Sequence, residues 1–192
     1  MVILLEQLKE FTENATRNII LPVSYQKGDP EPPPPRAAEV FRARLPDSKA
    51  AKKKAPYILH QIMTNKDAQN EGILLDSEAV VRTIFCVYHP DEQQGGVALL
   101  SLMDQLRISF LERVVVGAQF RLDLEAGIEV LVYPEDTAPY YAGEMVTTWH
   151  LPPVKRLDTT RVIHGMPPWD PNARHLEEII GLKGSEEHGE KQ

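Results

Sequence analysis

Histidine is the residue type in this chain best suited to general-base chemistry or metal binding near neutral pH. The six histidines are His60, His89, His150, His164, His175 and His188. None of them lies in an HxxxH or HExxH pattern, and the single cysteine excludes a Cys-based zinc site. His60 and His150 lie beside apolar residues in strand-like stretches, which favours structural histidines with satisfied hydrogen bonds. The sequence therefore predicts no metal site and no cofactor.

Motifs for nucleophilic catalysis and phosphate binding are also missing from the sequence. Ser101 and Ser109 lack the Gly-x-Ser-x-Gly elbow, and the glycine pair at 95–96 is not followed by the Lys-Ser/Thr of a P-loop. Asp123 and Glu144 are isolated carboxylates, expected to be solvated or to pair with a cation of a neighbouring subunit. No catalytic residue is predicted, and the chain is expected not to be an enzyme.

The most unusual compositional feature is a basic segment inside an acidic chain. The net charge is -7 over 192 residues, yet residues 36–54 hold seven basic and two acidic side chains. The preceding residues 28–35 are rich in proline, which favours an extended polyproline conformation. Residues 28–55 are therefore predicted to form an exposed arm or loop. Its candidate interface residues are Arg36, Arg42, Arg44, Lys52, Lys53 and Lys54.

Three interpretations of this arm stay open. It could dock on an acidic neighbouring subunit, contact DNA phosphates without sequence preference, or remain a solvated loop. The acidic balance of the whole chain and the absence of interleaved aromatic and basic residues count against a nucleic-acid-binding module.

Hydrophobic periodicity predicts the elements that would position these groups. Apolar residues at helical spacing from Leu4 to Ile19 predict an N-terminal helix that ends before Pro22. Residues 65–72 are predicted to form a polar turn, and the glycines at 95–96 to break the chain. The predicted strands span 57–63, 78–89, 119–132 (interrupted at Gly127) and 140–151, and a second helix spans 97–113.

The element order α-β-β-α-β-β predicts an α+β fold with a mainly antiparallel four-stranded sheet and helices on one face. The core domain would comprise residues 1–27 and 56–157. Residues 158–192 are predicted to be a partly disordered tail with a short helix at 175–182. Trp169 lies among prolines of this tail and is expected to anchor it on its own or a neighbouring subunit.

The sequence also indicates where the protein is made. No stretch approaches the ~18 apolar residues of a membrane span, and the first residues lack the basic and apolar regions of a signal peptide. Synthesis in the cytoplasm is expected. Cys86 lies in an apolar run and is predicted to be buried and unreactive.

Several stretches of the chain together match a known family. The closing strand from Pro139 to Pro152 is the most distinctive, and the others are Pro56-Tyr57-Ile58, the strand at 81–88, the polar turn at 91–96 and the helical stretch at 100–107. Through these stretches, residues 56–156, together with the N-terminal helix, resemble the tail terminator (tail completion) proteins of long-tailed bacteriophages. The arm and the residues after 157 have no counterpart in the smallest members of that family.

This resemblance implies a non-enzymatic structural subunit of the virion neck, made in the host bacterial cytoplasm. It would form a homo-hexameric ring, bind the tail tube protein, and join the tail to a head-side connector or head-closure protein. Glu144 and Trp169 would then join the basic residues as interface candidates. The alternatives are another neck protein, such as a head-closure or connector subunit, and a nucleic-acid-binding module that uses the arm.

Overall fold

The structure is a computed structural model that describes residues 1–25, 31–46, 54–68, 74–133 and 138–155. The chain divides into a compact unit, Met1–Val154, and a second unit, Lys155–Gln192. Apart from Lys155, the second unit lies outside the described residues, and so do the predicted tail and its helix at 175–182. None of the described helices combines the length and the apolar character needed to cross a membrane.

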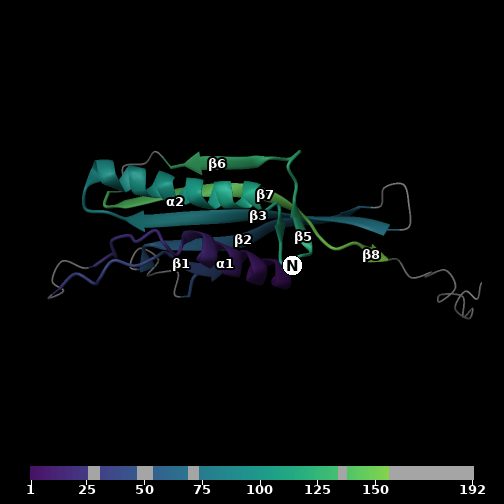
Figure 1. Cartoon of the computed structure of the whole chain (residues 1–192), viewed down its shortest axis with the longest axis horizontal. Helices are drawn as coiled ribbons and strands as arrows, with labels where there is room; N and C mark the ends of the chain where they lie inside the picture. The colour runs from purple at the N-terminus through teal and green to yellow at the C-terminus, as the bar shows by residue number, and fades with distance from the viewer. Residues whose placement is uncertain (26–30, 47–53, 69–73, 134–137, 156–192) are drawn as a thin grey trace, which may run out of the picture. The chain divides into compact units, whose positions relative to one another are not determined.

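The described residues form two helices and one large sheet (Figure 1). The helices are α1 (Val2–Thr16) and α2 (Glu92–Glu112). Along the sheet the strand order is β1-β2-β3-β7-β5-β4, with β6 also paired to β7. The strands are β1 (Glu39–Arg42), β2 (Tyr57–Ala68), β3 (Leu74–Tyr88), β4 (Val115–Val116), β5 (Phe120–Leu122), β6 (Ile128–Val132), β7 (Tyr140–His150) and β8 (Val154–Lys155).

The predicted four-stranded, mainly antiparallel sheet with the order α-β-β-α-β-β is wrong. The sheet is larger and mixed, because β1 pairs in parallel with β2, from Glu39 opposite Tyr57 to Arg42 opposite His60. β1 lies within the basic segment that was predicted to be an arm, and its Val40 is buried. A four-residue strand among charged residues carries too little alternation to be recognised, and its partner, not its own sequence, stabilises it.

Two predicted breaks turn out to be regular structure. β2 continues to Ala68, through residues assigned to a polar turn, because it pairs with β3 along its whole length with a bulge between Ile62 and Thr64. α2 begins at Glu92, where the Asp91 carboxylate accepts a hydrogen bond from the backbone N–H of Gln94 at 2.9 Å. Gly95 therefore lies inside the helix.

Gly95 is needed there for space. A Cβ at this position would collide with the ring of Tyr141 on β7, so glycine allows the first turn of α2 to approach the sheet closely. The strand predicted from residue 119 up to the interruption at Gly127 is shorter than expected, because β5 ends at Leu122. The strands predicted at 128–132 and from residue 140 lie as expected, in β6 and β7.

The main core lies between the helices and one face of the sheet. Alternate residues of β3 and β7 are buried on this face, including Phe85 and Trp149. The Phe110 ring stacks on Phe11 of α1 with centroids 5.2 Å apart, and meets Trp149 edge-on at 5.3 Å. Each such pair contributes about 1 kcal/mol beyond the area that it buries, so Phe110 joins both helices to β7.

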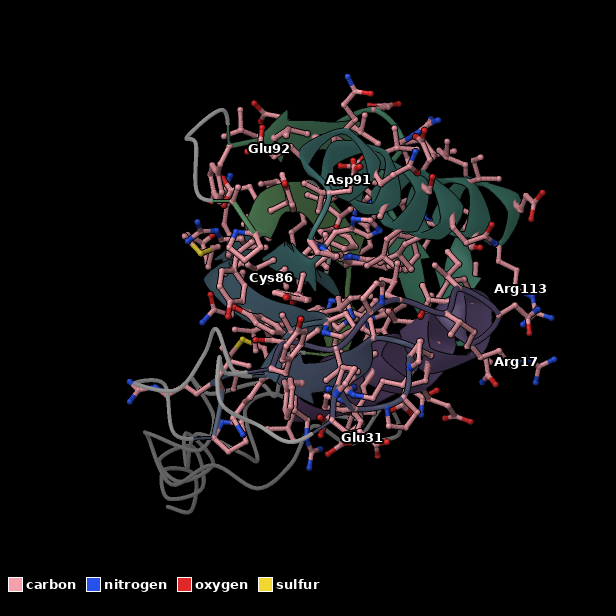
Figure 2. The ribbon with its side chains drawn as sticks, turned by 90° about the vertical axis from the view of Figure 1, so that its left-hand side faces the viewer. Arg17, Glu31, Cys86, Asp91, Glu92 and Arg113 are labelled. Carbon is pink, nitrogen blue, oxygen red and sulfur yellow. The ribbon has the colours of Figure 1, made fainter. Side chains whose placement is uncertain are left out.

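A smaller apolar cluster covers part of the opposite face. Its buried members are Ala55, Tyr57, Leu59, Cys86 and Tyr88. Cys86 is 6% exposed, as predicted, and is labelled in Figure 2.

His60 on β2 is fully buried and ties α1 to the sheet. Its Nε2 lies 2.9 Å from Thr12 Oγ1 on α1, and its Nδ1 lies 2.9 Å from Thr83 Oγ1 on β3. Burial lowers the pKa of His60 from 6.5 to about 3, so the ring is neutral at physiological pH. The prediction of a structural histidine with satisfied hydrogen bonds is confirmed for His60.

Candidate functional site

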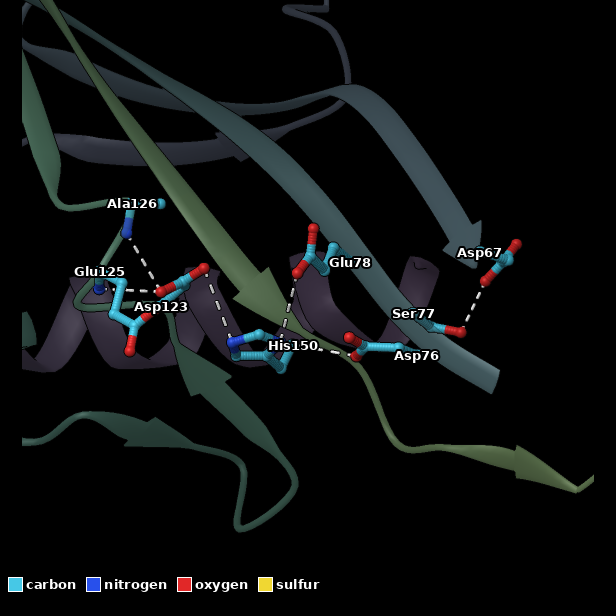
Figure 3. Close-up of polar contacts among 8 residues, drawn as sticks. All are labelled: Asp67, Asp76, Ser77, Glu78, Asp123, Glu125, Ala126 and His150. Atoms are coloured by element: carbon cyan, nitrogen blue, oxygen red, sulfur yellow. Dashed lines mark hydrogen bonds and ion pairs between the residues drawn. The ribbon is translucent and has the colours of Figure 1, made fainter. Parts of the chain in front are cut away.

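His150 lies at the end of β7, and strand pairing surrounds it with carboxylates. Glu78 of β3 is its partner in the register, and Asp76 lies two residues away on the same face of β3. Asp123 follows β5, whose Arg121 also pairs with His150 in the register. Figure 3 shows Asp76, Glu78 and Asp123 pointing toward the imidazole. We call these four residues the His150 cluster.

The distances show a loose arrangement of groups. His150 Nδ1 lies 3.7 Å from Glu78 Oε1 and 3.9 Å from Asp76 Oδ1, and Nε2 lies 3.7 Å from Asp123 Oδ2. One ligand atom from each of Asp76, Glu78 and His150 lies within 4.8 Å of the others. The His150 side chain is 22% exposed, so the cluster is partly shielded from solvent but remains accessible to small ions.

Asp123 is the best-ordered acid of the His150 cluster. Its Oδ1 accepts hydrogen bonds from the backbone N–H groups of Glu125 at 2.9 Å and Ala126 at 3.1 Å. The bond from Ala126 is the main reason that the pKa of Asp123 is lowered, and the bond from Glu125, His150 and Arg121 lower it further. Asp123 is therefore ionised, and its second oxygen faces His150.

The sequence did not reveal this cluster. The sequence predicts Asp123 to be an isolated carboxylate, solvated or paired with a neighbouring subunit, and His150 to be a structural histidine. The four residues come from three separate stretches that only strand pairing brings together. The available signal was Asp76-x-Glu78, which places two carboxylates on one face of a strand.

Glu144, an interface candidate, has partners inside its own chain. Its Oε2 accepts hydrogen bonds from the Arg82 guanidinium on β3 and from the Tyr133 hydroxyl, the latter at 2.6 Å. The Tyr133 hydroxyl is the main cause of the lowered pKa of Glu144, followed by Arg82. The sequence predicts that Glu144 is solvated or paired with a neighbouring subunit. In the structure its carboxylate pairs with Arg82 and Tyr133 of the same chain.

The basic interface candidates are scattered and partly neutralised. Arg36 donates to the Lys54 carbonyl at 3.1 Å and lies 3.7 Å from the Glu39 carboxylate. Arg42 forms an ion pair with Glu6 of α1. Arg44 is exposed and Lys54 is half-buried, whereas Lys52, Lys53 and Trp169 lie outside the described residues.

A hollow also lies between the two helices. It lies between the C-terminal halves of α1 and α2 and has a volume of about 240 Å³. Its lining is mixed and consists of Phe11, Asn14, Ala15, Ser109, Glu112 and Arg113. Figure 2 shows Arg113 projecting outward from the molecule, so this lining specifies no ligand.

The outer edge of β6 is a third surface feature. Within the described part of the chain, the sheet gives β6 no partner besides β7. Val130, Leu131 and Val132 are 39%, 49% and 40% exposed, so consecutive apolar side chains emerge on both faces of this strand. Tyr133 donates its N–H to the Ala142 carbonyl, which fixes the antiparallel alternation. The backbone groups of Val130 and Val132 consequently point away from β7.

No protein-family model matches the sequence. No curated protein matches it either.

Proposed function

We propose that this chain is a structural subunit of a long-tailed bacteriophage that acts as a tail terminator. It assembles as a ring, most simply of six copies, on the last ring of the tail tube protein. The other side of the ring receives the head-side connector or head-closure protein. The support for this identity is the resemblance of residues 56–156 to that family.

The structural observation that carries the assembly part of this proposal is the outer edge of β6. An exposed apolar edge strand is a site for pairing with another chain, and proteins that stay monomeric protect such edges with charges, prolines or covering segments. Glu129 is the one charged residue of β6, and the exposed Val130, Leu131 and Val132 that follow it provide none of these protections. Contact between this edge and a different surface of an identical subunit would close a ring.

The experiment combines the full-length chain with the tail tube protein encoded by the same genome. Electron microscopy should show a ring at one end of each tube and tubes of arrested length. Mass measurement of the isolated caps should give about six copies. The proposal fails if the chain stays monomeric in the presence of tubes and leaves their length unchanged.

A matched pair of variants tests the role of the β6 edge. Leu131→Lys places a charge on the edge and should abolish ring formation while leaving the monomer folded. Leu100→Lys on α2 changes a side chain that is also 49% exposed and should assemble normally. Equal assembly by both variants would remove β6 from the contact.

A further inference from the structure

The distances inside the His150 cluster suit a shared ion better than direct hydrogen bonds. The separations of 3.7 and 3.9 Å from His150 Nδ1 to the Glu78 and Asp76 oxygens exceed the range of about 2.7–3.2 Å for N–H···O bonds. Two ligand atoms that each lie about 2.1 Å from one tetrahedral zinc ion are about 3.4 Å apart. Small side-chain rotations therefore bring all three groups to coordination distance.

The other side of the imidazole carries the support that a metal-binding histidine needs. A histidine that binds a metal through one nitrogen usually donates its other N–H to a carboxylate or carbonyl, which fixes the tautomer and the ring. Asp123 Oδ2 faces Nε2 at 3.7 Å, and the backbone N–H groups of Glu125 and Ala126 hold its Oδ1. At 3.7 Å the two atoms are not hydrogen-bonded, and a small rotation of either side chain would direct the Nε2 proton to Asp123. The Nδ1 lone pair would then face Asp76 and Glu78.

Charge also favours a cation at this place. Three carboxylates converge on His150, and the neighbouring cations in the register are Lys66, opposite Glu78, and Arg121, opposite His150. A bound cation would offset the repulsion between the carboxylates, which strengthens as solvent is partly excluded.

We propose that Asp76, Glu78 and His150 bind one Zn²⁺ per chain, and that Asp123 is the positioning residue for His150. The nitrogen ligand favours zinc over Mg²⁺ or Ca²⁺, which prefer sites made entirely of oxygen. The ion would join β3 to β7 at this end of the sheet. Zinc binding at this site would not require phage assembly.

The test is isothermal titration calorimetry of the full-length chain with ZnCl₂, after removal of metal with EDTA and dialysis. One Zn²⁺ should bind per chain. His150→Gln and Glu78→Gln should each weaken binding at least tenfold. Asp123→Asn should weaken it about tenfold, the effect expected for a partner that orients a ligand.

Asp67→Asn is the matched control. This carboxylate also lies on the β2–β3 hairpin, but it accepts a hydrogen bond from Ser77 Oγ at 2.6 Å and does not face His150 (Figure 3). The variant removes one nearby negative charge and leaves the ligand set intact. Its affinity for Zn²⁺ should therefore stay within twofold of the affinity of the unchanged chain. A loss as large as that of Glu78→Gln would indicate nonspecific attraction to an acidic surface and overturn the proposal.

Two other results would also overturn it. Equal affinity of the unchanged chain and His150→Gln would place zinc elsewhere, for example on His164 or His175. Equal affinity for MgCl₂ and ZnCl₂ would contradict a nitrogen ligand. Circular dichroism verifies that each variant is folded, and Glu78→Gln keeps the test decisive if His150→Gln does not fold.

Discussion

His60 and His150 are both strand histidines in the same sheet, yet their surroundings differ in almost every respect. His60 is fully buried between two threonine hydroxyls, with no carboxylate partner among the described residues, and burial lowers its pKa to about 3. His150 is partly exposed and faces three carboxylates at distances longer than hydrogen bonds. The residue type alone therefore decides nothing. Both ring nitrogens of His60 are hydrogen-bonded, so this histidine stabilises the fold. The ring nitrogens of His150 have only longer contacts, so this histidine can bind a ligand.

The largest expected effect is the loss of the buried histidine. His60→Leu leaves the hydroxyls of Thr12 and Thr83 without their imidazole partner in the core, which should destabilise the fold by about 3 kcal/mol. Urea unfolding at pH 7.5 measures the change. His150→Leu is the control and should change the free energy of unfolding by less than about 1 kcal/mol. Similar losses in the two variants would remove the distinction between the two sites.

The second prediction uses pH. Because the folded pKa of His60 is about 3 and the unfolded pKa about 6.5, its neutral ring supports full stability above pH 6.5. Stability should then fall by roughly 1.4 kcal/mol per pH unit as the pH drops from 6 to 4.5, because the unfolded chain binds a proton that the folded chain excludes.

Unfolding curves of the unchanged chain and His60→Gln between pH 6 and 4.5 test this slope. This window lies above the range in which most carboxylates titrate. His60→Gln should show a clearly flatter dependence on pH. A slope as steep in the variant would mean that another group causes the acid sensitivity.

The third prediction concerns the acid that supports His150. Asp123→Ala removes the acceptor for the backbone N–H groups of Glu125 and Ala126, which should destabilise the fold by about 1 kcal/mol. Asp123→Asn keeps an oxygen acceptor and should be less affected. Thermal unfolding with EDTA present measures both variants. An unchanged stability of Asp123→Ala would mean that these bonds add nothing over solvation.

The smallest effect is expected at His150 itself. His150→Gln should shift the free energy of unfolding by less than about 0.5 kcal/mol when EDTA is present, since no direct hydrogen bond from the ring holds the fold. Zinc should raise the Tm of the unchanged chain, because it binds the folded chain and not the unfolded one. It should not raise the Tm of the variant, which lacks the histidine ligand. A large loss of stability in EDTA would make His150 a structural residue like His60.

Strong local patterns predicted the elements that the structure confirms, and elements that depend on distant partners escaped prediction. The alternation at 128–132 and the long apolar strand from residue 140 are properties of single segments. β1 forms only because it pairs with β2, and glycine is needed at position 95 of α2 only because the ring of Tyr141 lies against it. The His150 cluster follows the same rule, because its members are separated by up to 74 positions in the sequence and meet only through strand register.

The bulge between Ile62 and Thr64 divides the β2–β3 hairpin into two halves of unequal local stability. Tyr57 to His60 are buried, whereas the β2 side chains from Met63 to Asp67 are exposed. Backbone amides in the outer half should therefore exchange with deuterium through small, local openings, while those in the inner half exchange only when the whole domain opens. Asp76 and Glu78 lie opposite this outer half. An ion bound there would couple local opening of this outer half to the slower opening of the core.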